Sequence, residues 1–273
     1  MYSCYRKNNI HERLVEIMLT KDQLKHFTEE GYVILEGAFS AAAMENLTRR
    51  IDYYVDEHVQ KIAGVGGDNG VSRAKEITFT PHLVKKEEVF QQFVSQPLFV
   101  EITTQLLGPD VSLYHDQAVY KRPETHKEFP WHQDNGYGLV LSEQYVTCWL
   151  ALEDATVENG CIWVKPGTHK DGVVKHEKTP IGWQCYHGED QGIPVPLKKG
   201  DMVVFSSLLF HKSGPNVSNT IRKGYIVQFF PTQAVNAQTG NPFKKIAITK
   251  KGAAHLDLAY LEDQSDVEGL VKS

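Results

Sequence analysis

The beginning of the chain has the hydrophobic spacing and the end signals of a helix followed by a strand. In TKDQLKHFTEEG (residues 20–31), Thr20 is placed to cap the first turn, Gln23 fits the third helical position, and Gly31 can close the end. The next segment, YVILEGAF (residues 32–39), is rich in β-branched and aromatic residues, which favour a strand. The sequence therefore predicts a capped helix that leads directly into a strand.

Further helices are predicted between residues 40 and 108. The second helix begins at Ser40, and its apolar side falls on positions three or four apart, Met44, Leu47, Ile51 and Val55. It runs into GVGGDNG, whose four glycines make regular structure costly, so we expect residues 64–75 to form a mobile loop or a flexible connection. Residues 87–107 have further helical patterning and end at a Gly-Pro pair.

From Val111 onward the pattern changes to short apolar or alternating runs, each bounded by Gly, Pro, Asn or Asp. These runs are VSLYHDQAVYKR, QYVTCWLALED, CIWVKP, DMVVFSS and RKGYIVQFFP. Such runs are typical of the strands of sandwiches and barrels, and they do not alternate with helices as the strands of a parallel sheet do. The predicted fold class is mainly β with flanking N-terminal helices.

We predict a single domain over residues 1–273, because no linker or repeat divides the helices from the strands. All-β sandwiches and barrels often use this length as one domain. The predicted parts are a loose leader (1–17), a helix-rich support (18–110), a β core (111–235) and a C-terminal extension (236–273).

Charge and cysteine usage narrow the class of protein. Of the 273 residues, 41% are hydrophobic and 23% are charged, and the formal net charge of −5 gives no reason to expect nucleic acid as a partner. No apolar run approaches the length of about eighteen residues that predicts a membrane span. The cysteines, Cys4, Cys148, Cys161 and Cys185, are widely separated, which fits neither a disulfide framework nor a zinc ribbon and favours a reducing, cytoplasmic location.

The segment WHQDNGYG (residues 131–138) contains a candidate metal-binding pair. Side chains two positions apart in an extended segment lie on the same side, so His132 and Asp134 can reach one ion. The best-placed third ligand is His211, which follows a predicted strand and precedes a Gly-Pro turn. Two imidazoles and one carboxylate form the facial triad of non-haem iron(II) oxygenases, but zinc in hydrolases accepts the same ligands.

Arg222 favours iron with a keto-acid cosubstrate. It lies eleven residues after His211, at the start of a predicted strand. A fixed guanidinium holds a carboxylate in a two-pronged contact, which suits the distal carboxylate of a keto acid such as 2-oxoglutarate while the other end of that acid chelates the metal. Ser213 is placed to donate a second hydrogen bond to the same group.

Together, these motifs resemble the phytanoyl-CoA dioxygenase-like family of iron(II)- and 2-oxoglutarate-dependent oxygenases. The segments that carry the resemblance are HQD (132–134), NGCIWVKPGTHK (159–170), KKGDMVVF (198–205), HKSGPN (211–216) and Arg222. It covers roughly residues 20–235, and the set of motifs is far more specific than any one of them. The fold that it implies is a double-stranded β-helix, a cupin-like jelly roll with the metal site in its mouth.

The resemblance also implies a role for each matched residue. The implied iron ligands are His132, Asp134 and His211. The implied cosubstrate contacts are Arg222, Ser213, Gln117, Trp149 and Lys75. One departure is Lys212, where the family often has glycine; if its side chain points inward, it favours an anionic substrate. Fe(II) is then the metal, 2-oxoglutarate the cosubstrate and dioxygen the oxidant, and ascorbate is a candidate supporting reductant.

The predicted reaction is hydroxylation of an unactivated C–H bond of a small metabolite, with release of succinate and carbon dioxide. Asp134 favours hydroxylation, desaturation or ring closure over halogenation, since related halogenases lack this ligand. We expect a small polar substrate, selected by loops at 64–80, 121–130 and 176–194. A metal- or 2-oxoglutarate-binding module without turnover and a zinc hydrolase on a cupin-like barrel stay open as alternatives, and the sequence does not predict the oligomeric state.

Overall fold

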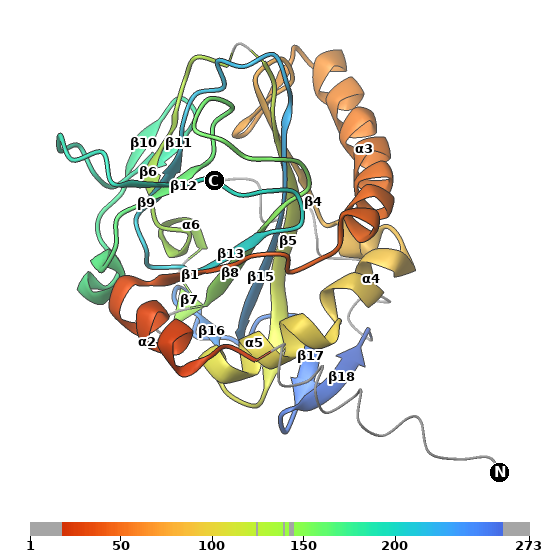
Figure 1. The fold of residues 1–273 in the computed structure, drawn as a ribbon, viewed down its shortest axis with the longest axis vertical. Coiled ribbons are helices and arrows are strands. Elements are labelled where there is room, and N and C mark those ends of the chain that lie inside the picture. The colour runs from red at the N-terminus through yellow and green to blue at the C-terminus, as the bar shows by residue number, and fades with distance from the viewer. Residues whose placement is uncertain (1–17, 124, 139, 142–144, 259–273) are drawn as a thin grey trace.

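In the computed structural model, the described residues are 18–123, 125–138, 140–141 and 145–258. The predicted leader, residues 1–17, lies outside them. Antiparallel strands dominate this part of the chain, with a few helices beside them, so the predicted mainly β class is confirmed (Figure 1). No helix in the described ranges is both long and apolar enough to cross a membrane.

The first of the described helices begins and ends where its capping residues predict. Thr20 and Gln23 form the expected capping box, in which the Gln23 amide donates to Thr20 Oγ1 at 3.2 Å and the Thr20 amide donates to Gln23 Oε1 at 2.9 Å. Gly31 ends this helix at φ 87°, a left-handed conformation that glycine adopts without strain. The α-helices are α2 (Lys21–Glu30), α3 (Ala41–Gly64), α4 (Glu88–Val94), α5 (Pro97–Leu107) and α6 (Asn135–Gly138).

The glycine-rich segment contains regular structure, which corrects the prediction of a loop over residues 64–75. Two short strands, β2 (Asp68–Asn69) and β3 (Ser72–Arg73), form a hairpin there. Arg73 stabilises it, because its guanidinium donates to the carbonyl oxygen of Gly70 at 2.8 Å and to that of Pro180 at 2.5 Å. The glycines allow the turns of the hairpin, and Arg73 holds it in place. A hydrophobic pattern could not have predicted this contact, because arginine is polar.

The strands form one large and one small antiparallel sheet. In spatial order, the large sheet contains β1 (Tyr32–Leu35), β13 (Met202–Ser206), β8 (Val146–Ala151), β15 (Arg222–Pro231), β5 (Val111–Lys121), β17 (Ile246–Lys250) and β18 (Ala253–Asp257), and β4 (Ile77–Pro81) also pairs with β5. The small sheet contains β12 (Ile193–Val195), β9 (Ile162–Val164), β14 (His211–Ser213) and β6 (Phe129–His132). Two-stranded pairs are formed by β10 (Glu177–Thr179) with β11 (Gly182–Gln184) and by β7 (Val140–Leu141) with β16 (Val235–Asn236). Part of the predicted C-terminal extension thus belongs to the large sheet.

Alternation along the central strands gives the large sheet two apolar faces. On β8, Cys148 and Leu150 pack with the apolar faces of α3, α4 and α5, whereas Trp149 and Ala151 pack with Ile162 and the other apolar residues of the small sheet. In Figure 1 these helices lie along one side of the large sheet and the small sheet lies on the other. The result is three layers, and the functional side chains lie between the two sheets.

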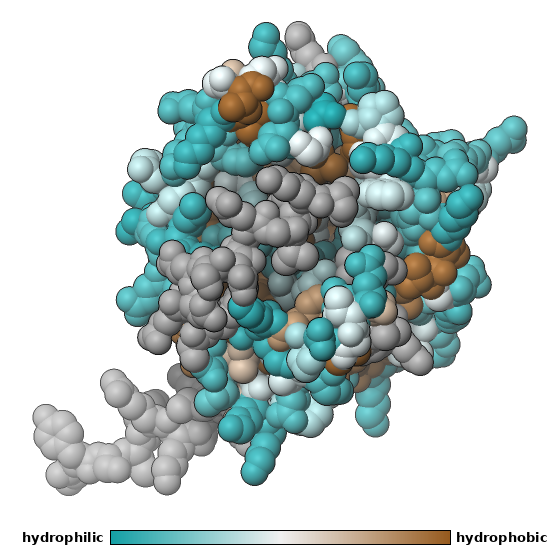
Figure 2. Space-filling view, turned by 180° about the vertical axis from the view of Figure 1, so that it is seen from behind, coloured by the Kyte–Doolittle hydropathy of each residue, from teal (hydrophilic) through white to brown (hydrophobic). Residues whose placement is uncertain are grey.

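The outer surface follows the ordinary distribution of polar residues. On the face shown in Figure 2, most of the surface is hydrophilic and the apolar side chains lie in small separate groups. Scattered apolar residues of this kind are normal on a folded chain. This face therefore gives no indication of a broad apolar docking surface.

Gly224 provides space that Trp149 needs. A Cβ atom at Gly224 would lie 2.4 Å from Trp149 Cζ2, so the indole packs directly on the backbone of β15. We expect Gly224→Ala to lower the free energy of unfolding by about 1–3 kcal/mol through overpacking, measured by urea denaturation. Gly64→Ala is the control, because nothing lies within 4 Å of the added methyl group, and it should be neutral or stabilising. Equal urea midpoints for the two variants would contradict this account.

Candidate metal centre and anion pocket

Strand pairing in the small sheet brings the predicted triad together. His132 ends β6, and His211 begins β14 directly opposite it. Asp134 follows two residues after His132, and its Oδ1 lies 3.7 Å from His132 Nε2 and 3.4 Å from His211 Nε2. The centroids of the two imidazole rings are 4.1 Å apart. Among the described residues, these three side chains form a group whose ligand atoms all lie within 4.8 Å of one another.

Backbone hydrogen bonds set the orientation of both imidazoles. His132 Nδ1 donates to the carbonyl oxygen of Pro130 at 2.8 Å, and His211 Nδ1 donates to that of Leu209 at 3.0 Å. Each Nδ1 therefore carries the proton, and each Nε2 directs a lone pair towards the centre of the triad. Burial, together with the neighbouring His211, lowers the pKa of His132 to about 3, so this imidazole is neutral and able to bind a metal at neutral pH.

Two further side chains hold the carboxylate of Asp134. Thr147 Oγ1 donates to Asp134 Oδ2 at 2.5 Å, and Gln228 Nε2 donates to the same oxygen at 2.9 Å, which leaves Oδ1 for a metal. Burial by itself would raise the pKa of Asp134, but the charge and hydrogen bond of His211, with His132 and Thr147, outweigh it and hold that pKa below the usual range. Thr147 and Gln228 were not predicted as part of the site. The only sequence signal for them is that each is a polar residue on an otherwise apolar strand.

Gln133, which lies between His132 and Asp134, forms hydrogen bonds with segments distant in the sequence. Its side-chain amide is fully buried, and Nε2 donates to the carbonyl oxygens of Gly172 and Leu208, each at 2.7 Å. Its Oε1 accepts a hydrogen bond from the backbone amide of Val174 at 2.9 Å. The segment from His132 to Asp134 is therefore held on the side opposite the triad as well.

Arg222 is a buried cation whose hydrogen-bonding groups are unused. Its side chain is 1% exposed, and its three guanidinium nitrogens have no hydrogen-bond partner among the described residues. The guanidinium carbon lies 5.3 Å from the centroid of the Trp149 ring. Burial lowers the pKa of Arg222 to about 10, so the group stays charged at neutral pH. A buried charge without a partner is costly, which indicates a place for an anionic ligand.

The predicted companions of Arg222 lie along the same face of the large sheet. Trp149 and Gln117 both pair with Ile226 on β15. Ile226 lies four residues beyond Arg222, so the two side chains are on the same face of the strand. Ser213 Oγ accepts a hydrogen bond at 3.0 Å from the Nζ of Lys121, a fully buried lysine that pairs with Arg222 across the strands. Lys121 was missed, because a lysine at the end of a predicted strand is ordinarily a solvated residue.

Three other residues lie away from this pocket. Lys75 is exposed, and within the described part of the chain no hydrogen bond or ion pair links it to the triad or to Arg222. Lys212 is buried on the opposite face of β14 from His211, where its Nζ binds Glu128 at 2.9 and 3.0 Å. An inward Lys212 that selects an anionic substrate is therefore excluded. His169 Nε2 donates a hydrogen bond to the Thr28 carbonyl oxygen at 3.1 Å and so joins its turn to α2.

The donor set makes this a candidate mononuclear metal site, and the buried guanidinium of Arg222 makes the inner face of the large sheet a candidate place for an anionic cosubstrate. Two imidazoles and one carboxylate suit iron(II), although zinc accepts the same donors. The family model for phytanoyl-CoA dioxygenase (PhyH) matches residues 27–224, more than half of the chain. The chain belongs to this family.

Comparison with individual proteins agrees with that assignment. The chain is 26% identical over 232 residues to the peroxisomal phytanoyl-CoA dioxygenase of Homo sapiens, which covers 78% of this chain and 68% of the human protein. The solved structure of ThoJ, a non-heme monooxygenase, superimposes with a TM-score of 0.69 at 22% identity, over 88% of this chain and 92% of ThoJ. The epimerase SnoN, in a complex with Fe3+, alpha ketoglutarate and nogalamycin RO, gives a TM-score of 0.62 at 18% identity, over 81% and 87% of the two chains. These two structures show a shared fold.

The hydrogen bonds to Asp134 Oδ2 have a measurable consequence. We expect Thr147→Val and Gln228→Leu each to weaken metal binding by about 10- to 100-fold, because the carboxylate loses its fixed orientation. Anaerobic titration of the metal-free protein with Fe(II) measures the affinity. Thr147→Ser keeps the hydroxyl group and should bind metal as the unchanged protein does. If Thr147→Val binds as tightly as Thr147→Ser, the hydroxyl does not orient Asp134.

Proposed function

We propose that this protein is an Fe(II)- and 2-oxoglutarate-dependent oxygenase that hydroxylates a C–H bond of a small metabolite, releasing succinate and carbon dioxide. The observation that carries the proposal is the buried guanidinium of Arg222, which has no partner among the described residues and lies behind a triad of two histidines and an aspartate. A metal site alone fits several chemistries. A metal site beside a pocket that requires an anion fits a cosubstrate with a free carboxylate.

Each part of the site then has a task. His132, Asp134 and His211 hold the metal through Nε2, Oδ1 and Nε2 and leave its other side open. Arg222 and Ser213 bind the distal carboxylate of 2-oxoglutarate, while Trp149 and Gln117 line the pocket between that carboxylate and the metal. When bound, iron and 2-oxoglutarate supply the oxidising chemistry, and the protein supplies binding, orientation and exclusion of side reactions.

The alternatives account for less of the structure. A zinc hydrolase has no use for a buried, charged Arg222, whose burial without a partner lowers stability. A binding module without turnover explains the pocket, but it does not explain two side chains that orient one oxygen of Asp134. The presence of Asp134 also favours hydroxylation over halogenation. Epimerisation, the reaction named for SnoN, uses a similar fold, so reaction type needs its own test.

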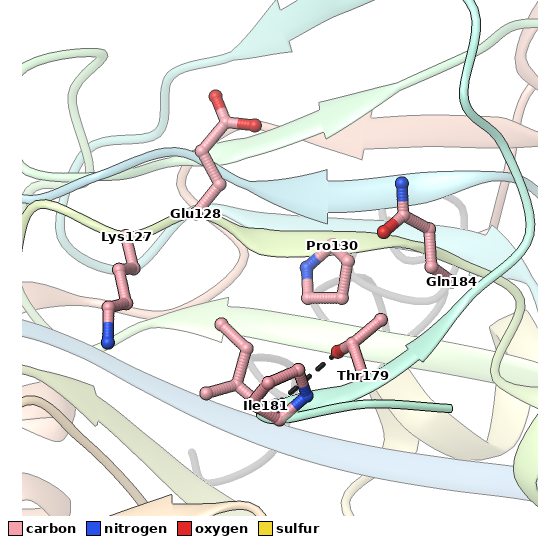
Figure 3. Close-up of a pocket in the computed structure, with 7 residues that line it drawn as sticks. Lys127, Glu128, Pro130, Thr179, Ile181 and Gln184 are labelled. Carbon is pink, nitrogen blue, oxygen red and sulfur yellow. Dashed lines mark hydrogen bonds between the residues drawn. The ribbon is translucent and has the colours of Figure 1, made fainter. Parts of the chain in front are cut away.

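Two of the three segments predicted to select the substrate line one groove. Residues of 121–130 and 176–194 line a groove of about 370 Å³, formed by Lys127, Glu128, Pro130, Thr179, Pro180, Ile181 and Gln184 (Figure 3). Pro130 is also the residue whose carbonyl oxygen holds His132 Nδ1. Its lining combines apolar side chains with the charged or amide groups of Lys127, Glu128 and Gln184, which favours a small polar molecule as the substrate.

We also infer that the two sheets form one double-stranded β-helix within a single domain. From β5 to β15 the chain crosses between the sheets repeatedly, since β5, β8, β13 and β15 lie in the large sheet and β6, β9, β12 and β14 in the small one. The N-terminal helices share a core with the large sheet, which supports one domain over the described residues. A cytoplasmic location remains a prediction from cysteine usage, although the human relative is named as peroxisomal.

Anaerobic addition of Fe(II) and then 2-oxoglutarate tests the cofactor chemistry directly. We expect the unchanged protein to develop a weak visible charge-transfer band, because 2-oxoglutarate chelates the bound metal. Asp134→Ala should lose the band through loss of the metal, and Arg222→Met through loss of the cosubstrate. Arg50→Ala, which removes a surface arginine paired with Glu87 at 2.8 Å, should leave the band unchanged.

Thermal unfolding of the metal-free protein separates loss of the cosubstrate from loss of the fold. Arg222→Met removes an unpaired buried charge, so it should unfold at the same temperature as the unchanged protein or a higher one. The absence of the band in the unchanged, iron-loaded protein would contradict the oxygenase proposal. A zinc-loaded protein that hydrolyses substrates without 2-oxoglutarate would replace it.

Labelled dioxygen distinguishes hydroxylation from epimerisation. Succinate release from the iron-loaded protein identifies a substrate among small polar metabolites. We expect the product to contain one oxygen atom from labelled dioxygen, measured by mass spectrometry, because hydroxylation inserts that atom into the substrate. A product of unchanged mass, formed with release of succinate, would contradict hydroxylation and would favour epimerisation. A product that has lost two hydrogen atoms would favour desaturation or ring closure.

A further inference from the structure

Lys121 is a second buried cation next to Arg222. It ends β5, its side chain is fully buried, and it pairs with Arg222 across the strands. Its Nζ donates to Ser213 Oγ at 3.0 Å, to the carbonyl oxygen of Ser213 at 3.3 Å, and to that of Gly214. A Cβ atom at Gly160 would lie 2.6 Å from the carbonyl oxygen of Gly214 and 3.1 Å from Lys121 Cδ, so the lysine stem and the turn after β14 both pack against this glycine. The lysine stem thus lies inside the fold.

These hydrogen bonds determine whether the Ser213 hydroxyl acts as a donor or an acceptor towards a ligand. Lys121 Nζ is the donor in its hydrogen bond with Ser213, so this bond uses a lone pair of Ser213 Oγ. The hydroxyl hydrogen of Ser213 is then free to donate to a ligand. Arg222 also has only donors, and none of them is used within the described part of the chain. The pocket between these groups therefore presents hydrogen-bond donors to a ligand and requires acceptors from it.

The charges around the pocket also favour a ligand that accepts hydrogen bonds and carries a negative charge. Lys121 Nζ donates to three uncharged oxygens, and the nearby acid Glu128 is bound by Lys212 at 2.9 Å on the outer face of the small sheet. Burial and, after it, the charge of Arg222 lower the pKa of Lys121 well below its usual range. An entering carboxylate counters both effects and stabilises the ammonium form. A carboxamide carries no charge and counters neither.

We propose that Lys121 is a specificity-determining residue of this pocket, which admits a ligand that ends in an ionised carboxylate and rejects one that ends in a carboxamide. An ionised carboxylate has only acceptors, whereas an amide group places two N–H donors against the donors of Arg222 and Ser213. A buried donor without an acceptor is costly, so this mismatch discriminates between molecules of nearly equal size. The inference rests on the proposed function, because it assigns the distal group of the cosubstrate to this pocket.

Lys121 also connects β5 to the turn after β14, so a purely structural role must be distinguished. If the role is purely structural, substitution of Lys121 lowers the stability of the protein and reduces its affinity for both ligands equally. A specificity role predicts that the ratio of the two affinities changes. The ratio is therefore the quantity to measure, together with thermal unfolding of each variant.

Succinate and succinamate, its monoamide, are suitable probes because neither needs iron. Their dissociation constants for the metal-free protein are measured by ligand-observed NMR titration, for the unchanged protein and for Lys121→Met. We expect the unchanged protein to favour succinate by at least about tenfold. Lys121→Met should lose most of that preference. Lys212→Met removes a buried lysine from the other face of the small sheet and should keep the preference in full.

A second variant keeps the test decisive if Lys121→Met does not fold. Lys121→Gln retains a donor for Ser213 and adds an acceptor, so it should bind succinamate more tightly than the unchanged protein does. Equal binding of the two probes by the unchanged protein, or an unchanged ratio in a folded Lys121 variant, overturns the inference. Turnover of 2-oxoglutarate by the iron-loaded protein is measured separately, so a protein that prefers succinate without turnover refutes the proposed function and leaves the role of Lys121 intact.

Discussion

The strict alternation of side chains along β8 and β15 is the constraint on which the rest of the structure depends. One face of each strand must be apolar, because α3, α4 and α5 cover it. Part of the other face is not covered by these helices and can carry polar side chains. There Thr147 and Gln228 donate hydrogen bonds to Asp134, and Trp149 lies beside Arg222. A shift of one residue in either strand would bury these polar groups against the helices.

The polar groups on the inner face are arranged by charge. At one end, two imidazoles surround a carboxylate whose second oxygen accepts hydrogen bonds from Thr147 and Gln228. At the other end, Arg222 is positive, and the hydrogen bonds of Lys121 Nζ go to uncharged oxygens of Ser213 and Gly214. The unpaired charge lowers the stability of the free protein, but it preorganises the pocket for an anion. The folded state thus stores part of the free energy that ligand binding later releases.

Much of this arrangement could be predicted from the sequence, for physical reasons that differ between residues. His132, Asp134 and His211 were predicted because metal chemistry needs those side chains at a spacing that strands allow, and the caps of α2 were predicted because they are local. Lys121, Thr147 and Gln228 were missed because their roles depend on pairing between distant strands. The hairpin at Asp68–Arg73 was missed because its anchor, the Pro180 carbonyl, is more than a hundred residues away.

Gln133 shows why the metal motif is not a portable unit. Its side chain joins the backbone at Gly172, Val174 and Leu208, so the stretch from His132 to Asp134 is held from behind by two separate segments of the chain. Transplanting only the three ligands to another scaffold would leave their backbone without this support. In protein engineering, the smallest transferable version of this centre therefore includes the buried glutamine and the carbonyl and amide groups that receive it.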